Sequence, residues 1–186
     1  MAATFGSNDI IGLFNADTSF INNTCIDYCI DFFNQNADVG VVGPMQVDSS
    51  GRVTHAGIFG TPSKPILADW YKSMRRVSRR NAKAVSVSGS AYFVRRSTWN
   101  ELTCCPFYRA ASPYALGALL PTPHFFEETF CSLHAAAHGY DVFFLGEALM
   151  RHEWHKSSKP GSQSHNFDIS REIYREACKI HGMEHE

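Results

Sequence analysis

The sequence predicts an α/β fold, in which helices cover a central sheet. A short apolar run at 10–14 ends in polar residues, an amphipathic helical pattern spans 21–32, and a second apolar run occupies 39–43. Apolar runs of this length are typical of buried strands, and the order strand, helix, strand favours a sheet with right-handed crossovers. With 186 residues, 44% of them hydrophobic, the chain is long enough for one domain with a substantial core.

The helix expected after the first strand has its apolar residues four, three, one and three positions apart, which places them on one face. Thr24 and Asp27 suit its first turn, and polar residues at 34–36 end it. Cys25 and Cys29 lie within the apolar face. Because none of the six cysteines forms a C-x-x-C pair, the pattern favours reduced thiols in a cytoplasmic protein over a disulfide framework.

The middle of the chain combines turns with short strands. Residues 48–51 predict a hairpin turn, whereas 61–83 is irregular and basic. Strand character resumes over 85–94, around Gly89, and Ser97 suits the N-cap of a short helix. A loop with four prolines follows at 103–124.

The last third predicts two more helices and a strand. A helix pattern over 126–137 is stopped by Gly139, and 141–145 reads as a strand. A final helix over 169–180 ends at Gly182. We therefore expect one domain at 1–158, with a linker and a helix at 159–186 that pack on it.

Charge and hydropathy narrow the class of function. The net charge of −1 argues against nucleic-acid binding through bulk electrostatics. No secretory signal pattern occurs at the N-terminus, and no apolar run approaches the ~20 residues of a membrane span. Seven Lys or Arg residues lie between Lys64 and Lys83, against the single acid Asp69. This segment could contact an anionic acceptor or a lipid-phosphate surface, although a solvated loop is the simpler interpretation.

Carboxylate and imidazole side chains stand where strands and helices are expected to begin or end. Asp17 follows the first strand, Glu127 and Glu128 open a helix, and His152 follows a later strand. Such groups can bind a divalent cation and act as a general base. The alternative interpretations are a turn residue for Asp17, first-turn helix acids for the glutamates and a surface position for His152. His152 and His155 lack the H-E-x-x-H spacing of a catalytic zinc site.

Four phrases occur in an order that resembles the family 2 glycosyltransferases, particularly their rhamnosyl- and galactofuranosyl-transferase-like members. They are IIGLFNADTSF, VGVVGPMQVDSSGRVTHAGIFG, VSGSAYFVRRSTWNEL and FFEETFCSLHAAAHGYDVFFLGEALMRHEWHKS. The resemblance implies a GT-A-like fold, with a mixed sheet flanked by helices. It also implies an inverting transfer of a sugar from a nucleotide-sugar donor to the hydroxyl group of a glycan or other acceptor.

The resemblance assigns roles to particular residues. Asn15-Ala16-Asp17 matches the motif whose Asp holds Mn²⁺ or Mg²⁺ at the donor diphosphate, and His152 would join that metal. Glu128 matches the base that deprotonates the acceptor, and Glu127 would orient or bind the acceptor. Gly89 and Ser90 match a turn beside the donor sugar, where small residues let a substrate approach the backbone. Trp154 could stack on a sugar, although a core position is the simpler interpretation.

The chain also departs from this family. Relatives carry nucleotide-binding βα units before the metal-binding Asp, so the resemblance implies an N-terminally truncated fold. We expect the exposed sheet edge to be covered by the C-terminal helix, by a second copy in a homo-oligomer or by a partner chain. Phe130 stands where relatives often have another acid. The alternatives to transfer are a non-catalytic carbohydrate-binding or assembly module and, as a third idea, a metal hydrolase using His152 and His155.

Overall fold

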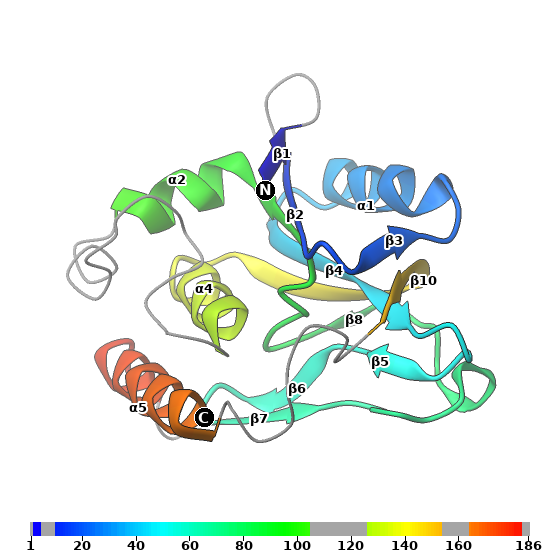
Figure 1. Cartoon of the computed structure of the whole chain (residues 1–186). Helices are drawn as coiled ribbons and strands as arrows, with labels where there is room; N and C mark the ends of the chain where they lie inside the picture. The colour runs from blue at the N-terminus through cyan, green and yellow to red at the C-terminus, as the bar shows by residue number, and fades with distance from the viewer. Residues whose placement is uncertain (1, 5–9, 105–125, 154–163, 184–186) are drawn as a thin grey trace.

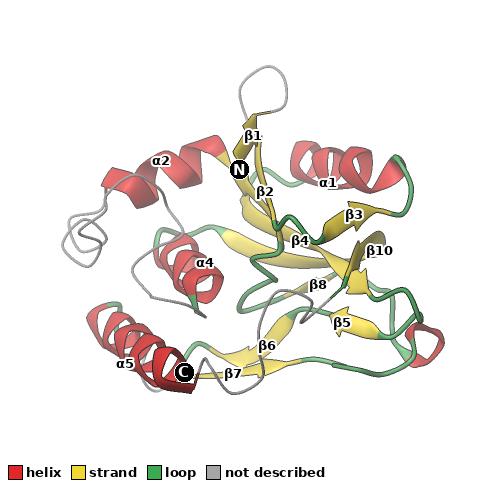
Figure 2. Ribbon diagram, viewed as in Figure 1, coloured by secondary structure: helices red, strands yellow, loops and turns green. Residues whose placement is uncertain are grey.

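The computed structural model describes residues 2–4, 10–104, 126–153 and 164–183, and a mixed sheet lies at its centre (Figures 1 and 2). The sheet contains β1 (Ala2–Thr4), β2 (Ile10–Phe14), β3 (Thr18–Phe20), β4 (Val39–Val47), β5 (Val53–His55), β8 (Ala82–Lys83), β9 (Ala91–Arg95) and β10 (Asp141–His152). The order is β1-β2-β9-β4-β10-β3, with β5 paired to β4 and β8 to β10. Strands β4 and β10 are parallel, and the other pairings are antiparallel.

Helices cover both faces of the sheet (Figure 1). On one face, α1 (Thr24–Gln35) buries Cys25, Cys29 and Phe33 against residues of β4, β9 and β10. The second, larger core contains residues of the helices α2 (Arg96–Cys104), α4 (Glu127–Ala137) and α5 (Ser164–Ile180). The predicted α/β architecture is therefore confirmed.

Several predicted elements are present near their expected bounds. The first strand and first helix are confirmed as β2 and α1, and the turn at 48–51 joins β4 to β5 as a hairpin. Gly139 and Gly182 follow α4 and α5 with φ values of +84° and +67°, the left-handed conformation that glycine adopts without strain at a helix end. The five cysteines within the described residues are free thiols.

The segment at 61–83 is more regular than its sequence indicates. Strands β6 (Ile58–Thr61) and β7 (Lys64–Leu67) form an antiparallel hairpin, and a single 3₁₀ turn, η1 (Met74–Arg76), follows. The prolines at 62 and 65 suggested an irregular chain. Pro62 lies in the turn, however, and Pro65 lies in a two-stranded sheet, where a missing N–H group is tolerated.

Two predicted boundaries near residue 90 were wrong. The strand begins at Ala91 rather than 85, because the backbone N–H of Ser90 donates to the Ser88 hydroxyl and the two hydroxyls lie 2.7 Å apart, which stabilises a turn. Helix α2 already begins at Arg96, so Ser97 lies inside the helix and is not its N-cap.

The edge of the sheet beside β2 is covered by a strand. Residues Ala2–Thr4 pair with β2 in antiparallel orientation. The C-terminal helix does not lie on this edge. Instead α5 packs on α4, where Tyr174 stacks on Phe126 with ring centroids 5.4 Å apart. Among the described residues, no helix combines the length and apolarity needed to cross a membrane.

Gly146 allows a close contact between β10 and the loop before β8. A β-carbon at this position would lie 2.5 Å from the carbonyl carbon of Arg79, and the three nearest atoms all belong to the Arg79 backbone. We expect Gly146→Ala to lower the free energy of unfolding by about 1–3 kcal/mol, because one of the two backbone segments must shift. Urea denaturation measures this change. Glu147→Ala, at the exposed neighbouring position, is the control, and equal stabilities of the two variants would contradict the contact.

Candidate functional site

Asp17 and His152 lie next to each other because two short stretches of chain meet at the end of β10. Strand β3 pairs antiparallel with β10, so that Thr18 lies opposite His152. The Asp17 Oδ1 atom is 3.5 Å from His152 Nε2, and the backbone N–H of Glu153 donates to the Asp17 carbonyl oxygen. His152 is buried and Asp17 is half-buried. A carboxylate and an imidazole, 135 positions apart in the chain, thus share one edge of the sheet.

The turn formed by Ser88, Gly89 and Ser90 lies beside this pair. The Ser90 hydroxyl donates to Gln46 Oε1 at 2.6 Å and lies 3.3 Å from His152 Nδ1. Since its proton is directed at Gln46, the Ser90 oxygen accepts from Nδ1–H of His152. When the His152 imidazole is neutral, this arrangement leaves its lone pair on Nε2, the nitrogen that faces Asp17 and the one needed to bind a metal.

Asn15 and Ala16 contribute through the backbone. The Asn15 N–H donates to the Ser90 carbonyl oxygen at 3.0 Å, and the Asn15 carbonyl accepts from both the N–H and the hydroxyl of Thr18. These bonds close the turn that presents Asp17. The side chains of Asn15 and Ala16 are exposed, so the structure brings Asp17, and not its two predecessors, against His152.

Glu128 lies on the other side of the same turn. A β-carbon added to Gly89 would be 3.2 Å from Glu128 Cβ and 3.4 Å from its Oε2 atom. The side chain therefore packs over the glycine, and any larger residue at 89 would crowd it. The Ser88–Ser90 turn thus contacts Glu128 through Gly89 and His152 through Ser90.

The surroundings of Glu128 favour its protonated form. Burial, followed by the charge of Glu127, raises the pKa of Glu128 to about 8 from an ordinary value of 4.5. The Ser132 hydroxyl donates to the Glu128 carbonyl and also lies 3.2 Å from the Tyr92 hydroxyl, which joins the first turn of α4 to β9. A carboxyl with a raised pKa is suited to exchange a proton near neutral pH.

Glu127 is the first residue of α4, directly before Glu128. Both acids lie in the first turn, where the helix dipole favours negative charge. The preceding residue, Phe126, has a φ of +64°, a left-handed conformation that is rare for a bulky side chain. Backbone strain therefore occurs directly before the two glutamates.

Two buried polar residues lie beside the site: Gln46, which was not singled out from the sequence, and His55, which belongs to the family-like segment at 53–57. Gln46 is fully buried in β4 and accepts from Ser90, and His55 lies opposite it on β5. Burial and the charge of His152 lower the pKa of His55 to about 3, so this ring is neutral. Its Nδ1 accepts the N–H of Gly57. The available signal for Gln46 was its place in β4, a strand whose nine residues are all buried. Buried amides normally serve as hydrogen-bond partners.

Asp17 and His152 suit a cation site in which two protein side chains bind the metal and the substrate supplies further ligands. Since metal–ligand bonds are about 2.1 Å long, donors 3.5 Å apart can bind one cation. Within the described residues, no group of three His, Cys, Asp or Glu side chains could hold a metal. Two protein ligands suit Mg²⁺ or Mn²⁺, which commonly complete their shells with phosphates and water. Trp154 and His155 lie outside the described residues.

Comparison with known families gives a match over most of the chain. The model of glycosyl transferase family group 2 matches residues 10–174. The chain therefore belongs to this family, and its mixed sheet with flanking helices is consistent with a GT-A-like fold. It contains a glycosyltransferase domain, for which the family implies a nucleotide-sugar donor and an acceptor. No curated protein matches the chain.

Proposed function

We propose that the chain is an inverting, metal-dependent glycosyltransferase that moves a sugar from a nucleotide-sugar donor to an acceptor hydroxyl. The observation that carries this proposal is the turn at 88–90, which contacts the Asp17–His152 pair on one side and the half-buried side chain of Glu128 on the other. Transfer with inversion needs these two parts: a site for the leaving diphosphate and a base for the acceptor.

Each side chain has a defined task in this proposal. Asp17 and His152 would hold Mn²⁺ or Mg²⁺, which when bound would supply positive charge to neutralise the departing diphosphate. Glu128 accepts the proton of the acceptor hydroxyl as the acceptor oxygen bonds to the anomeric carbon and the bond from that carbon to the diphosphate oxygen breaks. Glu127 orients the acceptor, and its negative charge helps to keep Glu128 basic.

Gly89 and Ser90 position the reacting groups. Gly89 leaves room for Glu128, and Ser90 fixes the ring of His152 through its hydroxyl. We place the donor sugar beside this turn, where the absence of a side chain at 89 allows close approach. A rhamnosyl- or galactofuranosyl-type donor remains a prediction from the resemblance, and a homo-oligomer or partner chain remains one from the expected open sheet edge. A cytoplasmic location remains a prediction from the cysteine pattern.

The raised pKa of Glu128 gives a pH-dependent signature. In the metal-free protein, carbon-13 NMR should detect this carboxyl titrating near pH 8. Because the folded-state pKa is above the ordinary value, the contribution of the protonated carboxyl to stability is complete below pH 4.5 and is lost as the pH rises through about 8. Glu127→Gln should lower the Glu128 pKa, since it removes a neighbouring charge. Titration at an ordinary carboxyl pKa would contradict the buried environment.

The test of the proposal is turnover with a panel of nucleotide sugars in the presence of Mn²⁺. Hydrolysis of the donor serves as the readout while the acceptor is unidentified, and the products are separated by chromatography. We expect hydrolysis of at least one donor, and its loss on chelation of the metal. Absence of both turnover and nucleoside-diphosphate binding would support a non-catalytic module instead.

A further inference from the structure

We propose that residues 64–80, together with the β4–β5 turn, form a docking surface for an anionic lipid membrane. The surface has two parts, an apolar segment at 66–71 and a cationic pocket that follows it. The proposal does not rest on glycosyl transfer, because its readout is lipid binding alone.

The apolar segment exposes four large side chains in six residues. Ile66 is 62% exposed, Leu67 40%, Trp70 47% and Tyr71 51%. Large apolar side chains of these types are usually buried, so a cluster of exposed ones marks an interaction surface. The rings of Trp70 and Tyr71 lie 5.6 Å apart, and both residue types are enriched at the interface between lipid and water.

The backbone holds this segment in an unusual conformation. Asp69 and Tyr71 have φ values of +51° and +62°, left-handed conformations on either side of Trp70. Hydrogen bonds from Tyr71 N–H to the Val53 carbonyl and from Val53 N–H to the Lys72 carbonyl fix the segment against β5. The exposure of Trp70 is therefore built into an ordered turn.

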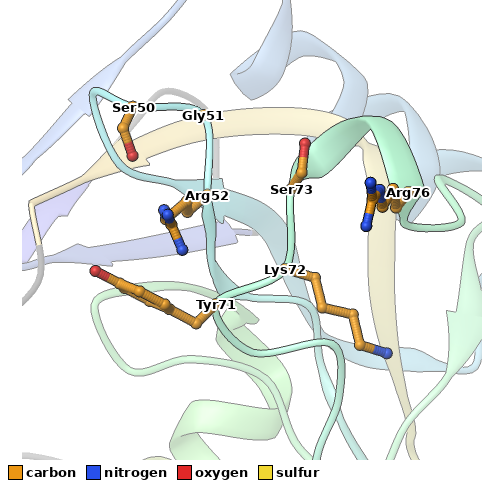
Figure 3. A pocket seen from close by; sticks show the side chains of 7 residues that line it. All are labelled: Ser50, Gly51, Arg52, Tyr71, Lys72, Ser73 and Arg76. Atoms are coloured by element: carbon orange, nitrogen blue, oxygen red, sulfur yellow. The ribbon is translucent and has the colours of Figure 1, made fainter.

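The pocket beside this turn has a volume of about 760 Å³ (Figure 3). Its cations are Arg52, Lys72 and Arg76, and the other described residues that line it are Ser50, Gly51, Tyr71 and Ser73, so no carboxylate is among them. The Arg52 guanidinium lies over the Tyr71 ring, 4.7 Å from its centroid. Met74 N–H donates to the Gly51 carbonyl, which holds the two walls together.

The placement of the cations suits an array of phosphates better than one soluble anion. In Figure 3, Arg52 lies with Tyr71 on one side of the chain at 71–73, whereas Lys72 and Arg76 lie on the other side. Lys72 is also paired with Asp69 at 2.7 Å. The exposed Arg75 and Arg80 extend the positive charge along the following residues. Adjacent apolar and basic groups match the acyl region and the headgroups of an anionic membrane.

This surface is joined to the candidate functional site. The Ser49 hydroxyl donates to the Glu153 carboxylate at 3.2 Å, and Glu153 follows His152. Docking through the β4–β5 turn would therefore bring the end of β10 close to the membrane.

Vesicle co-sedimentation of the full chain tests the proposal. We compare phosphatidylcholine vesicles with vesicles that also contain phosphatidylglycerol, at low and high salt. We expect binding to the anionic vesicles only, weakened by salt. Removing two charges with Arg52→Gln/Arg76→Gln should lower the partition coefficient about tenfold or more, and Trp70→Ser should also lower it.

Matched variants separate this surface from net charge and general hydrophobicity. Arg175→Gln/Lys179→Gln removes two exposed cations of α5, and Ile180→Ser removes an apolar side chain that is 50% exposed. Both should bind as the parent chain does, and thermal unfolding checks that every variant is folded. Equal losses in the test and control variants, or no binding to anionic vesicles, would overturn the proposal. Binding of inorganic phosphate without vesicle binding would also overturn it, in favour of a soluble ligand.

Discussion

Glu128→Gln is expected to lower the rate of sugar transfer by roughly 10²–10⁴-fold, the range that a positioned general base contributes. The glutamine keeps the size of the side chain, which packs over Gly89, but it cannot accept the acceptor proton. Because the substitution removes no proposed metal ligand, binding of nucleoside diphosphate with Mn²⁺ should be retained. Initial rates and isothermal titration calorimetry measure the two quantities.

Two companion variants make this result specific. Glu128→Asp keeps the carboxylate with a shorter reach, so it should recover part of the rate. Glu176→Gln removes an exposed carboxylate of α5 and should leave the rate unchanged. An unchanged rate in Glu128→Gln, with the fold intact, would remove this residue from the mechanism.

Asp17→Asn is expected to abolish metal-dependent binding of nucleoside diphosphates and to lower turnover at least about a hundredfold, because a bound cation supplies several kcal/mol of charge stabilisation. The amide keeps the shape of the side chain and loses the negative charge that a hard cation requires. Electron paramagnetic resonance of Mn²⁺ and calorimetry with a panel of nucleoside diphosphates measure the effect.

Asp31→Asn provides the control for charge, since Asp31 is an exposed residue of α1. It should bind Mn²⁺ and nucleoside diphosphate as the parent chain does. If Asp17→Asn retained binding and the control lost it, the metal would have to lie elsewhere.

The elements of the fold that could be predicted are those with a local signature. The apolar run of β2, the helical spacing of α1 and the glycines after α4 and α5 all mark their elements through nearby residues. The β6–β7 hairpin was missed because its two prolines suggested an irregular chain, although one lies in the turn and the other in a two-stranded sheet, where they cost little. Its pairing is visible only once the chain has folded.

The same distinction applies to the candidate site. Asp17 and His152 could be singled out because polar residues end their strands, but their 3.5 Å separation depends on the pairing of β3 with β10. The close packing of Glu128 depends on Gly89, and the orientation of His152 depends on Ser90 and Gln46. These contacts join distant segments, so no local pattern reports them, and the catalytic roles stay predictions.

The most direct measurement is a crystal structure of the chain with Mn²⁺ and a nucleoside diphosphate, in which anomalous scattering locates the metal. We predict one Mn²⁺ bound by both the Asp17 carboxylate and the His152 Nε2 atom, with the Glu128 carboxyl facing the space beside the diphosphate. A metal bound away from Asp17 and His152, or a Glu128 side chain closed off from the bound nucleotide, would contradict the account.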